Sequence, residues 1–522
     1  MKKAYIILTL LLAATLFACF KDPQISINDI EQQSLKAWIE KYHPEIKDNY
    51  QQEGGYYVEV LNKGILDSLP VTGKDVWVWY DFTARDLHGN VVETRNWELA
   101  NQLNSYTNYT HYVPAFRFSG ADSHSMMEGT YLATFNKLTV RDTESGQMVE
   151  MEVRYGTELR LYLPSSVTTS DTSTGDGGYE GEFTMDNSRP IIVDMLLYGH
   201  VSNPVAYEGN RVDAFAKING GLCAEHKAER EEETTTSSAR RRHVTRADEQ
   251  EDKIDTRPLE FFDGRWHQPT DSLEHLYVNY AYSPATTTFD FNVIGTDTLM
   301  YPQENIYDAG KIYGNNNLSE IDRRINEALV ERFGRGITYD EVLEADSLNA
   351  NPSAKVWYIG RFLDGYIFDT NIDEVKEIIY GEVVTPGSAL TFATSEPLDN
   401  DYILAWNYAL PTLRYGQWAT ILTASTYAYG YDGQVGSHTS TTTNTNAQYD
   451  MMNYYNYMNY MNSYYGYNYG GMYNSGYYGY NPYYYGYDYT YDSDSTVTIT
   501  TTSTEIPSFA PLIFQVFIEK NE

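Results

Sequence analysis

The chain has 522 residues, which is long enough for two or three domains. Apolar residues make up 42% of it and aromatic residues 15%, with 50 tyrosines, so it can bury a sizeable core. The formal net charge is −35. A surface with this charge repels nucleic acid and anionic membrane faces, so these totals exclude a nucleic-acid partner.

Residues 1–18 have the pattern of an export signal. Two lysines precede an apolar run that is too short for a comfortable membrane span. The run ends in Leu16-Phe17-Ala18-Cys19, which resembles a bacterial lipoprotein box. This resemblance implies cleavage before Cys19, acylation of Cys19 and a lipid anchor in the cell envelope, at the outer membrane, facing the periplasm or the surface. An ordinary cleaved signal is the alternative.

Three segments follow the signal in the first half of the chain. Residues 19–59 are polar apart from a helical stretch at 34–42, so we interpret them as a lipid tether and an N-terminal helix. Residues 60–205 alternate apolar and polar positions in short runs, which predicts a mostly β domain. Residues 206–258 are predicted to be a charged linker, because residues 225–258 hold almost no large apolar side chains.

Residues 259–345 are predicted to be an extension made of strands and one helix. The strand-like runs are HLYVNYAYS and TTFDFNVIG. The helix covers residues 318–334, with a start cap at Ser319 and an end at Gly334. Its apolar stripe consists of Ile321, Ile325, Leu329 and Phe333, which indicates a helix that packs on a core.

The last domain, residues 346–522, opens on a predicted hairpin. VWYIGRFLDGYIFDTN has two strand-like runs around Asp364-Gly365, a strong turn signal because glycine tolerates positive φ. Asp369 follows directly on Phe368. A carboxylate beside a buried aromatic ring needs a partner or a chemical role.

Three stretches of this domain follow one another in the order of a known family. They are the hairpin, ILAWNYALPTLRYGQWATILTASTYAYG at 403–430 and IPSFAPLIFQVFIE at 506–519. Together they resemble the FKBP (immunophilin) family of peptidyl-prolyl cis-trans isomerases, over residues 345–430 and 506–522. The resemblance implies an α+β, mostly antiparallel β fold with two FKBP-like domains, each a curved antiparallel sheet around a short helix, and a long low-complexity loop insertion in the second.

The resemblance also implies an aromatic pocket at matching positions of this sequence. The implied catalytic residues are Tyr358, Phe368, Asp369, Ile403, Trp406, Tyr429, Ile506 and Phe514. The implied substrate-binding residues are Leu390, Phe392, Tyr402 and Ala428, of which the first two stand where the family carries Phe-x-Phe, so one wall is altered.

Residues 60–205 resemble a degenerate copy of the same family. Their hairpin places Tyr80 at the position of Tyr358, but Val92-Glu93 stand where Phe-Asp is expected. The stretch EGTYLATFNKL has no Trp at its helix start. We therefore expect the fold to persist there without the pocket, in a binding or spacer role.

The implied chemistry needs no acid, base or nucleophile. An X–Pro bond rotates over a barrier of ~18–20 kcal/mol, and the twisted amide has lost its resonance and much of its dipole. A dry aromatic pocket with Trp406 as its floor would favour the twisted form, while the Ile403 N–H and the Tyr429 hydroxyl hold peptide carbonyls and Asp369 meets the turned carbonyl. The clients would be proline-containing exported polypeptides. A non-catalytic binding or adhesion lipoprotein that holds partner proteins or glycans is the alternative.

We expect no cofactor and no metal. The ten histidines include no His-x-x-x-His pair with a Glu, and no phosphate-cradling glycine loop is present. Once Cys19 is acylated, Cys223 has no partner for an intramolecular disulfide. The sequence leaves the oligomeric state open.

A tyrosine-rich tract fills the middle of the insertion, which spans residues 431–505. Its tyrosines run from Tyr449 to Tyr491, spaced by Asn, Gly and Met, without a periodicity that would separate an inside from an outside. Three interpretations stay open: a surface that docks partner chains or glycans through ring stacking, a lid over the pocket, and a tolerated flexible insertion.

Overall fold

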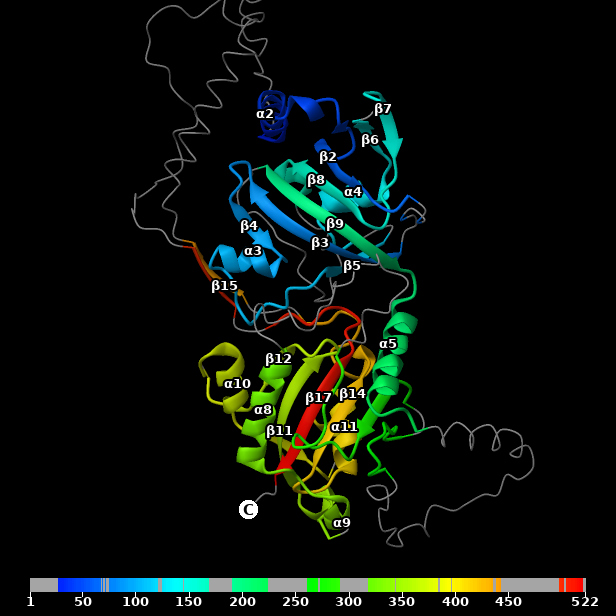
Figure 1. The fold of residues 1–522 in the computed structure, drawn as a ribbon, viewed down its shortest axis with the longest axis vertical. Coiled ribbons are helices and arrows are strands. Elements are labelled where there is room, and N and C mark those ends of the chain that lie inside the picture. Colours follow the sequence, from blue (N-terminus) through cyan, green and yellow to red (C-terminus); the bar gives the residue numbers. More distant parts are fainter. Residues whose placement is uncertain are drawn as a thin grey trace, which may run out of the picture.

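The computed structural model consists of two units, each a sheet with its helices, that follow one another along the long axis of the molecule (Figure 1). The export signal with Cys19 and the tyrosine tract lie outside the described residues, as does most of the predicted linker. The structure describes residues 27–66, 68, 71, 75–120, 124–143, 145–168, 190–223, 261–270, 273–291, 318–342, 344–383, 385–395, 397–434, 438–442, 497–501 and 504–519.

The first unit is built on a seven-stranded antiparallel sheet in the order β1-β2-β8-β9-β3-β4, with β5 paired to β3. Helix α4 lies against one face of this sheet and α2 against the other, while β6 and β7 form a separate hairpin. The bounds of its elements are α2 (Ile27–Tyr42), β1 (Tyr50–Gln51), β2 (Tyr56–Lys63), β3 (Val76–Asp86), β4 (Val91–Thr94), α3 (Trp97–Gln102), β5 (Ala115–Ser119), α4 (Glu128–Phe135), β6 (Leu138–Arg141), β7 (Met148–Met151), β8 (Thr157–Leu163) and β9 (Ile191–Val201).

The second unit is built on a six-stranded antiparallel sheet in the order β10-β14-β17-β11-β12, with β13 paired to β11. Two further strands, β15 and β16, form a hairpin inside the predicted insertion. The bounds are α5 (Pro204–Ile218), β10 (Leu276–Asn279), α8 (Leu318–Phe333), α9 (Tyr339–Val342), β11 (Ser353–Phe362), β12 (Ile367–Thr370), α10 (Asp373–Tyr380), β13 (Leu390–Ala393), α11 (Leu404–Ala409), β14 (Trp418–Thr423), β15 (His438–Thr442), β16 (Val497–Thr501) and β17 (Leu512–Glu519).

The strand order repeats from one unit to the other. The order β2-β8-β9-β3 in the first sheet corresponds to β10-β14-β17-β11 in the second. The last strand of each series forms a hairpin with the next strand, β3 with β4 and β11 with β12. Both hairpins have a β-bulge at the same place, after Ala84 in the first and after Gly360 in the second. Both turns contain a glycine with positive φ, +87° at Gly89 and +90° at Gly365. The α+β, mostly antiparallel β fold predicted from the sequence is confirmed.

The bulges fix which residues correspond between the units. Counting from Ala84 and Gly360, Phe82 occupies the position of Tyr358, so the match of Tyr80 with Tyr358 was wrong. The two tyrosines are alike in sequence, but the sheet register offsets them by two residues, which keeps both on the same face.

Helix α5 opens the second unit in the way that α2 opens the first. In α2, the Glu31 carboxylate accepts hydrogen bonds from the backbone N–H of Ser165 at 2.7 Å and from its hydroxyl at 2.5 Å. In α5, the Glu208 carboxylate accepts from the backbone N–H of Ser425 and, at 2.8 Å, from its hydroxyl. The predicted charged linker therefore begins too early, because an ordered, docked helix occupies its first residues.

The predicted extension at 259–345 belongs to the second sheet. Its run HLYVNYAYS contains β10, which pairs with β14 of the predicted last domain. The described part of TTFDFNVIG, residues 287–291, forms no strand. The predicted helix is confirmed as α8, which ends at Phe333, directly before Gly334 with its φ of +75°. Ser319 does not cap the helix but lies in its first turn, because α8 begins at Leu318.

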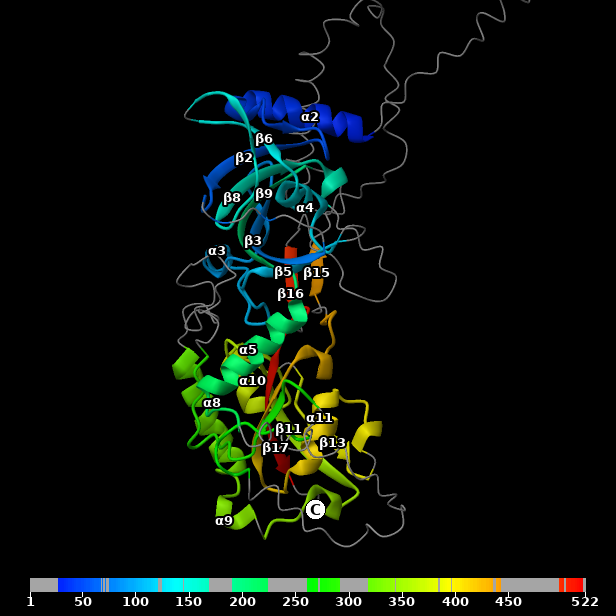
Figure 2. The same ribbon diagram turned by 90° about the vertical axis from the view of Figure 1, so that its right-hand side faces the viewer.

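The two faces of the second sheet carry different helices (Figure 2). On one face, Phe333 of α8 packs against Trp357, Trp418 and Phe517, with ring centroids 5.0 to 5.7 Å apart. On the opposite face lies α11, which covers β14 and β17. Side chains alternate between the two faces of a strand, so Trp357 points to α8 and Tyr358 to α11. No helix among the described residues is both long and apolar enough to span a bilayer.

Candidate active site

The bulge in the β11–β12 hairpin explains why a carboxylate follows a buried ring. Gly360 is opposite Asp369 and Arg361 is opposite Ile367, so Phe368 is the extra, unpaired residue of β12. A bulge breaks the strict alternation of a strand and re-aims side chains. As a result, the Phe368 ring and the Asp369 carboxylate both reach residues on the α11 side of the sheet.

The Phe368 ring lies directly over a glycine. A Cβ atom at Gly360 would stand 2.6 Å from Cζ of Phe368, so a larger residue there would displace the ring. The ring contacts Phe514 of β17 edge-on, at 5.9 Å between centroids. Gly360 and Phe514 are paired in the sheet, so the glycine creates the space in which the two rings meet.

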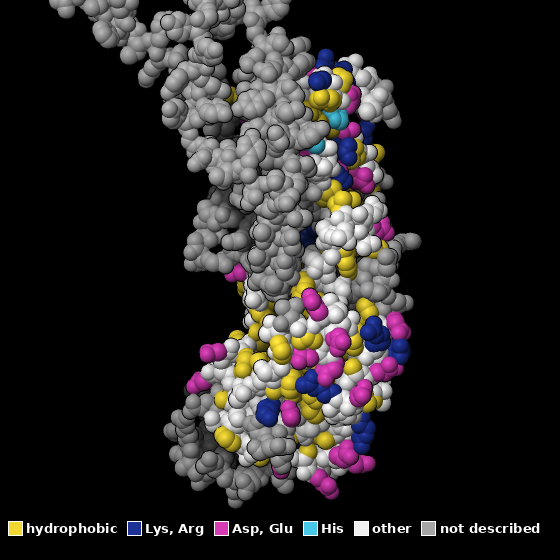
Figure 3. All heavy atoms as spheres, turned by 90° about the vertical axis from the view of Figure 1, so that its left-hand side faces the viewer, with side chains coloured by type: hydrophobic (Ala, Val, Ile, Leu, Met, Phe, Trp, Pro, Cys, Tyr) yellow, Lys and Arg dark blue, Asp and Glu magenta, His cyan; other side chains and the backbone are white. Residues whose placement is uncertain are grey.

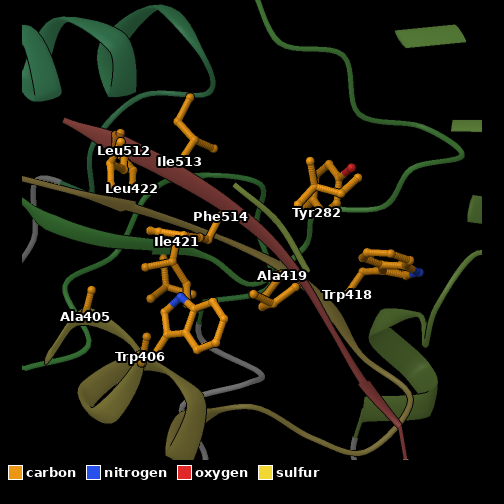
Figure 4. Packing of buried hydrophobic residues seen from close by; sticks show 14 of the residues in the cluster. Tyr282, Ala405, Trp406, Trp418, Ala419, Ile421, Leu422, Leu512, Ile513 and Phe514 are labelled. Carbon is orange, nitrogen blue, oxygen red and sulfur yellow. The ribbon is translucent and has the colours of Figure 1, made fainter. Parts of the chain in front are cut away.

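Trp406 connects the helix to these rings. It lies in α11, and Figure 4 shows its indole pointing toward β14 and β17, next to Ile421 and Phe514. Its ring centroid is 5.4 Å from that of Phe514 and 5.0 Å from that of Tyr358, both edge-on. Only 4% of Trp406 is exposed, and its buried indole N–H has no hydrogen-bond partner among the described residues. The ring is thus held by packing alone.

Asp369 is exposed and is surrounded by tyrosines. The Tyr358 hydroxyl donates a hydrogen bond to its Oδ2. Burial raises the pKa of Tyr358, and the Asp369 charge raises it further. Burial likewise raises the pKa of Tyr429 to about 12, and that of Tyr380, and in each case the Asp369 charge adds to the shift. These phenols stay protonated near neutral pH, so they can act as hydrogen-bond donors beside a carboxylate.

The remaining predicted residues border this aromatic cluster, which we define as Tyr358, Phe368, Trp406, Tyr429 and Phe514. Tyr402 lies 5.7 Å from Trp406 and 6.3 Å from Phe392 between ring centroids, and its hydroxyl donates to the backbone oxygen of Thr391 at 3.0 Å. Tyr429 meets Phe368 edge-on at 6.4 Å. Three partly buried residues, Leu390, Ile403 and Ala428, and the buried Ile506 pack against the same core.

Two backbone features set the ends of the site. Ile403 caps the start of α11, and its N–H makes no hydrogen bond to any described residue. Ile506 exchanges two backbone hydrogen bonds of 2.8 Å with Gln434, which joins the first residues of the insertion to the segment that follows it. The structure therefore brings the aromatic cluster and Tyr402 together around α11, and the other predicted residues pack against the core of the same unit.

Sequence reasoning missed three residues near this site. Gly360 was not singled out, although a glycine within a strand is a known signal of close approach. Tyr380 ends α10, a helix that the sequence analysis did not predict, and Tyr109 of the first unit stacks on it. No local pattern in the sequence links residues so far apart.

Two cavities are described elsewhere in the molecule. One, of about 940 Å³, lies between residues 284–291 and α8, and a smaller one, of about 40 Å³, lies between the units beside Asp364. Among the described residues no group of three or more His, Cys, Asp or Glu side chains is placed to hold a metal ion.

The first unit replaces the aromatic cluster with smaller side chains. By the hairpin register, Val92 stands at the position of Phe368 and Ala84 at that of Gly360. The sheet pairing places Val193 at the position of Phe514. Counted from the helix starts, Thr130 stands at the position of Trp406 and is buried with its hydroxyl on the Met127 carbonyl. The first unit keeps the fold and has Phe82 at the position of Tyr358, but it lacks rings at the positions of Phe368, Trp406 and Phe514.

A scan against protein-family models and a search of curated proteins found no match. Among solved structures, the chain is similar to the three FKBP domains of wheat FKBP73, at 9% identity over 90% of this chain and 95% of that one, with a TM-score of 0.18. It is also similar to a peptidyl-prolyl cis-trans isomerase from Pseudomonas syringae pv. tomato (16% identity, 34% of this chain, 66% of that one, TM-score 0.15). A third is FkpA from Escherichia coli (9% identity, 34% and 61%, TM-score 0.20). At these TM-scores the function has to be argued from the geometry of this chain.

Proposed function

We propose that the second unit is a peptidyl-prolyl cis-trans isomerase that acts on X–Pro bonds of exported polypeptides. One observation carries the proposal. The side chains of Tyr358, Phe368, Trp406 and Phe514 come from two strands, a bulge and a helix, and they form one continuous cluster with Asp369 at its exposed edge. The sequence places these residue types in FKBP order, and the geometry supports a shared role for them.

The chemistry follows from the properties of the prolyl amide. The planar amide has a large dipole that water solvates well, whereas the twisted amide has lost most of it. Aromatic faces around Trp406 exclude water, so they favour the twisted form over the planar one. The unbonded N–H of Ile403 would hold one carbonyl of the peptide. The phenol of Tyr429 would hold a second carbonyl, and the Asp369 carboxylate would orient the Tyr358 hydroxyl.

The test is an isomerisation assay on a proline-containing peptide with the full chain. We expect acceleration above the uncatalysed rate, which is one event in tens to hundreds of seconds. Asp369→Ala and Tyr429→Phe should each lower kcat/KM, because the first removes the carboxylate that orients the Tyr358 hydroxyl and the second removes a hydroxyl that holds the peptide. Thr426→Ala, at an exposed position in the turn before Ala428, serves as the control and should not change it.

A full chain that binds proline peptides without accelerating their isomerisation would favour the alternative, a lipoprotein that only holds partner proteins or glycans. We retain this alternative because Trp406 and Phe514 are almost completely buried, with 4% and 1% of these residues exposed. A binding measurement in parallel with the rate measurement separates the two functions.

We also propose that the chain is anchored in the cell envelope through a lipid on Cys19, with proline-containing polypeptides as its partners. The support is the sequence Leu16-Phe17-Ala18-Cys19 after an apolar run. Cys19→Ser should release the protein from the membrane fraction, as measured by fractionation and immunoblotting. A variant that stays in that fraction would contradict the lipid anchor.

A further inference from the structure

A loop of the first unit reaches the edge of the candidate site in the second. The Asn108 side chain donates a hydrogen bond to the backbone oxygen of Ile379 at 2.5 Å. The backbone carbonyl of Asn108 accepts a hydrogen bond from the Tyr366 hydroxyl at 2.5 Å. The next carbonyl, of Tyr109, accepts from the Thr504 hydroxyl at 2.8 Å. These bonds hold the backbone of the loop in place on both sides of Tyr109.

A side-chain hydrogen bond strengthens this contact two residues further on. His111 Nε2 lies 2.7 Å from Asp364 Oδ2, and the His111 ring stacks on Phe362 and Tyr366 at 4.8 and 4.4 Å. Asp364 belongs to the turn of the hairpin that carries Phe368 and Asp369. The first unit is therefore attached to the same hairpin that forms one wall of the site.

The fixed loop places the Tyr109 ring on a ring of the second unit. Tyr109 and Tyr380 stack with their centroids 4.1 Å apart and their planes within 5°, and both side chains are half-buried. Tyr380 lies near enough to Asp369 for that charge to affect its phenol, and Glu382 lies near enough to affect Tyr109. The stacked pair, here called the tyrosine ledge, therefore continues the site past Asp369.

Within the described part of the chain, the two carboxylates beside the ledge have no cationic partner. Asp369 and Glu382 are exposed, and neither forms an ion pair with any described residue. The sequence holds no Lys or Arg between Arg414 and Lys520, so the whole insertion cannot supply one. Flat aromatic faces next to exposed carboxylates suit a guanidinium group, which stacks on tyrosine and pairs with carboxylates.

We propose that the tyrosine ledge selects clients that carry a basic residue, preferably arginine, within a few residues of the proline. The proposal rests on the proposed isomerase site and adds a substrate class to it. Tyr109 of the first unit would contact the client directly, which gives the degenerate unit a role in substrate recognition.

The test compares three proline peptides that differ only in Arg, Ala or Glu beside the proline, with the substitution placed on either side of it in separate sets. Binding to the full chain is measured by fluorescence anisotropy and isomerisation in parallel. We expect the affinity to fall in the order Arg, Ala, Glu. Because cation–π contacts at exposed sites are modest, Tyr109→Ala should reduce the Arg-over-Ala ratio by roughly two- to fivefold.

The acidic surface alone would favour a cationic peptide, so the variant is the decisive comparison. Tyr109→Ala leaves the net charge and the Tyr109 carbonyl unchanged, and Tyr42→Ala, on an exposed tyrosine of α2, is the matched control that should keep the wild-type ratio. If Tyr109→Ala keeps the wild-type ratio of Arg-peptide to Ala-peptide affinity and still isomerises the Ala peptide, the proposed role of the tyrosine ledge is wrong while the proposed isomerase function stands. Failure to bind or isomerise any peptide would overturn both.

Discussion

The two units share a sheet order, a bulged hairpin and a docked first helix, yet they differ in what fills the space between sheet and helix. In the second unit a glycine in β11 admits the ring of Phe368, which contacts Phe514, and Trp406 from α11 packs against Phe514. In the first unit Ala84, Val92 and Thr130 stand at those positions. The shared backbone frame thus forms without these rings in the first unit, so the frame alone does not dictate the aromatic cluster.

The same comparison shows how one change constrains another. A ring at position 368 requires the absence of a Cβ at position 360, whereas Val92 is small enough to lie beside Ala84. Residues that touch across a bulge must be exchanged in pairs if packing is to be kept.

The largest effect is expected at Trp406. Trp406→Ala should destabilise the second unit by about 3–5 kcal/mol, because a large buried ring leaves a cavity, and it should abolish isomerisation. Phe82→Ala in the first unit, at the position of Tyr358, should cost a similar free energy of unfolding without changing kcat/KM in the folded protein. Denaturant unfolding and the peptide assay measure both.

Because Trp406→Ala could simply unfold the unit, Trp406→Phe is the second variant. It keeps most of the apolar volume, so we expect it to remain folded and to lose roughly tenfold or more in kcat/KM. Equal activity of the Trp406→Phe variant and the wild type would contradict the proposed role of the indole.

The pair Gly360 and Phe368 gives the next largest effect. Gly360→Ala should destabilise the protein by about 1–3 kcal/mol, because the new Cβ would stand 2.6 Å from the ring in the present geometry. The double variant Gly360→Ala/Phe368→Val recreates the pair of the first unit and relieves the overlap. Its free energy of unfolding should exceed the additive expectation by at least about 0.5 kcal/mol. Additivity would mean that the ring does not lie over the glycine.

The sequence predicted the hairpin and the helix at 318–334 because each has a local signal, whereas the residues that meet around Trp406 were implied by the resemblance to the FKBP family. Asp364-Gly365 marks its turn, and the stripe of Ile321, Ile325 and Leu329 marks its helix. The antiparallel sheets were predicted from the alternation of apolar and polar residues along the strands. The residue types of the site followed from their order in the chain.

Other features had no local signal. The offset that pairs Phe82 with Tyr358 depends on a bulge, and a bulge is visible only once two strands are paired. Helix α5 lies in a polar segment whose docking depends on Glu208 reaching Ser425, more than two hundred residues away. The Tyr109–Tyr380 stack is likewise a contact between units.

Helix docking offers a smaller and more evenly matched comparison. Glu31→Ala and Glu208→Ala should each cost about 1–3 kcal/mol, because each leaves a backbone N–H and a hydroxyl of a serine without a partner. We expect only Glu208→Ala to lower kcat/KM as well, since Ser425 opens the turn that leads to Ala428 and Tyr429. Loss of activity in Glu31→Ala at an intact second unit would contradict this separation.

The smallest expected effect is a pH dependence of stability that Asp81 confers on the first unit and not on the second. Asp81 of β3 stands where the second unit has Trp357, and its Oδ1 is buried without a hydrogen-bond partner among the described residues. Burial raises the pKa of Asp81 to about 6, although the Arg95 charge and a hydrogen bond from Tyr198 counteract it. The native state therefore holds this proton more tightly than the unfolded state does. Its contribution to stability is complete below a pH of about 4 and is lost as the pH rises through about 6.

Asp81→Asn replaces the carboxyl group with a neutral group of the same shape. Relative to this variant, the wild type should lose about 2 kcal/mol of unfolding free energy between pH 4 and pH 7, because each unit by which folding raises the pKa is worth about 1.4 kcal/mol. Denaturant titrations at several pH values measure this difference, with the first unit followed separately from the second through proteolysis. A parallel pH dependence of the two proteins would mean that Asp81 keeps its ordinary pKa, and an effect confined to the second unit would place the titrating group outside β3.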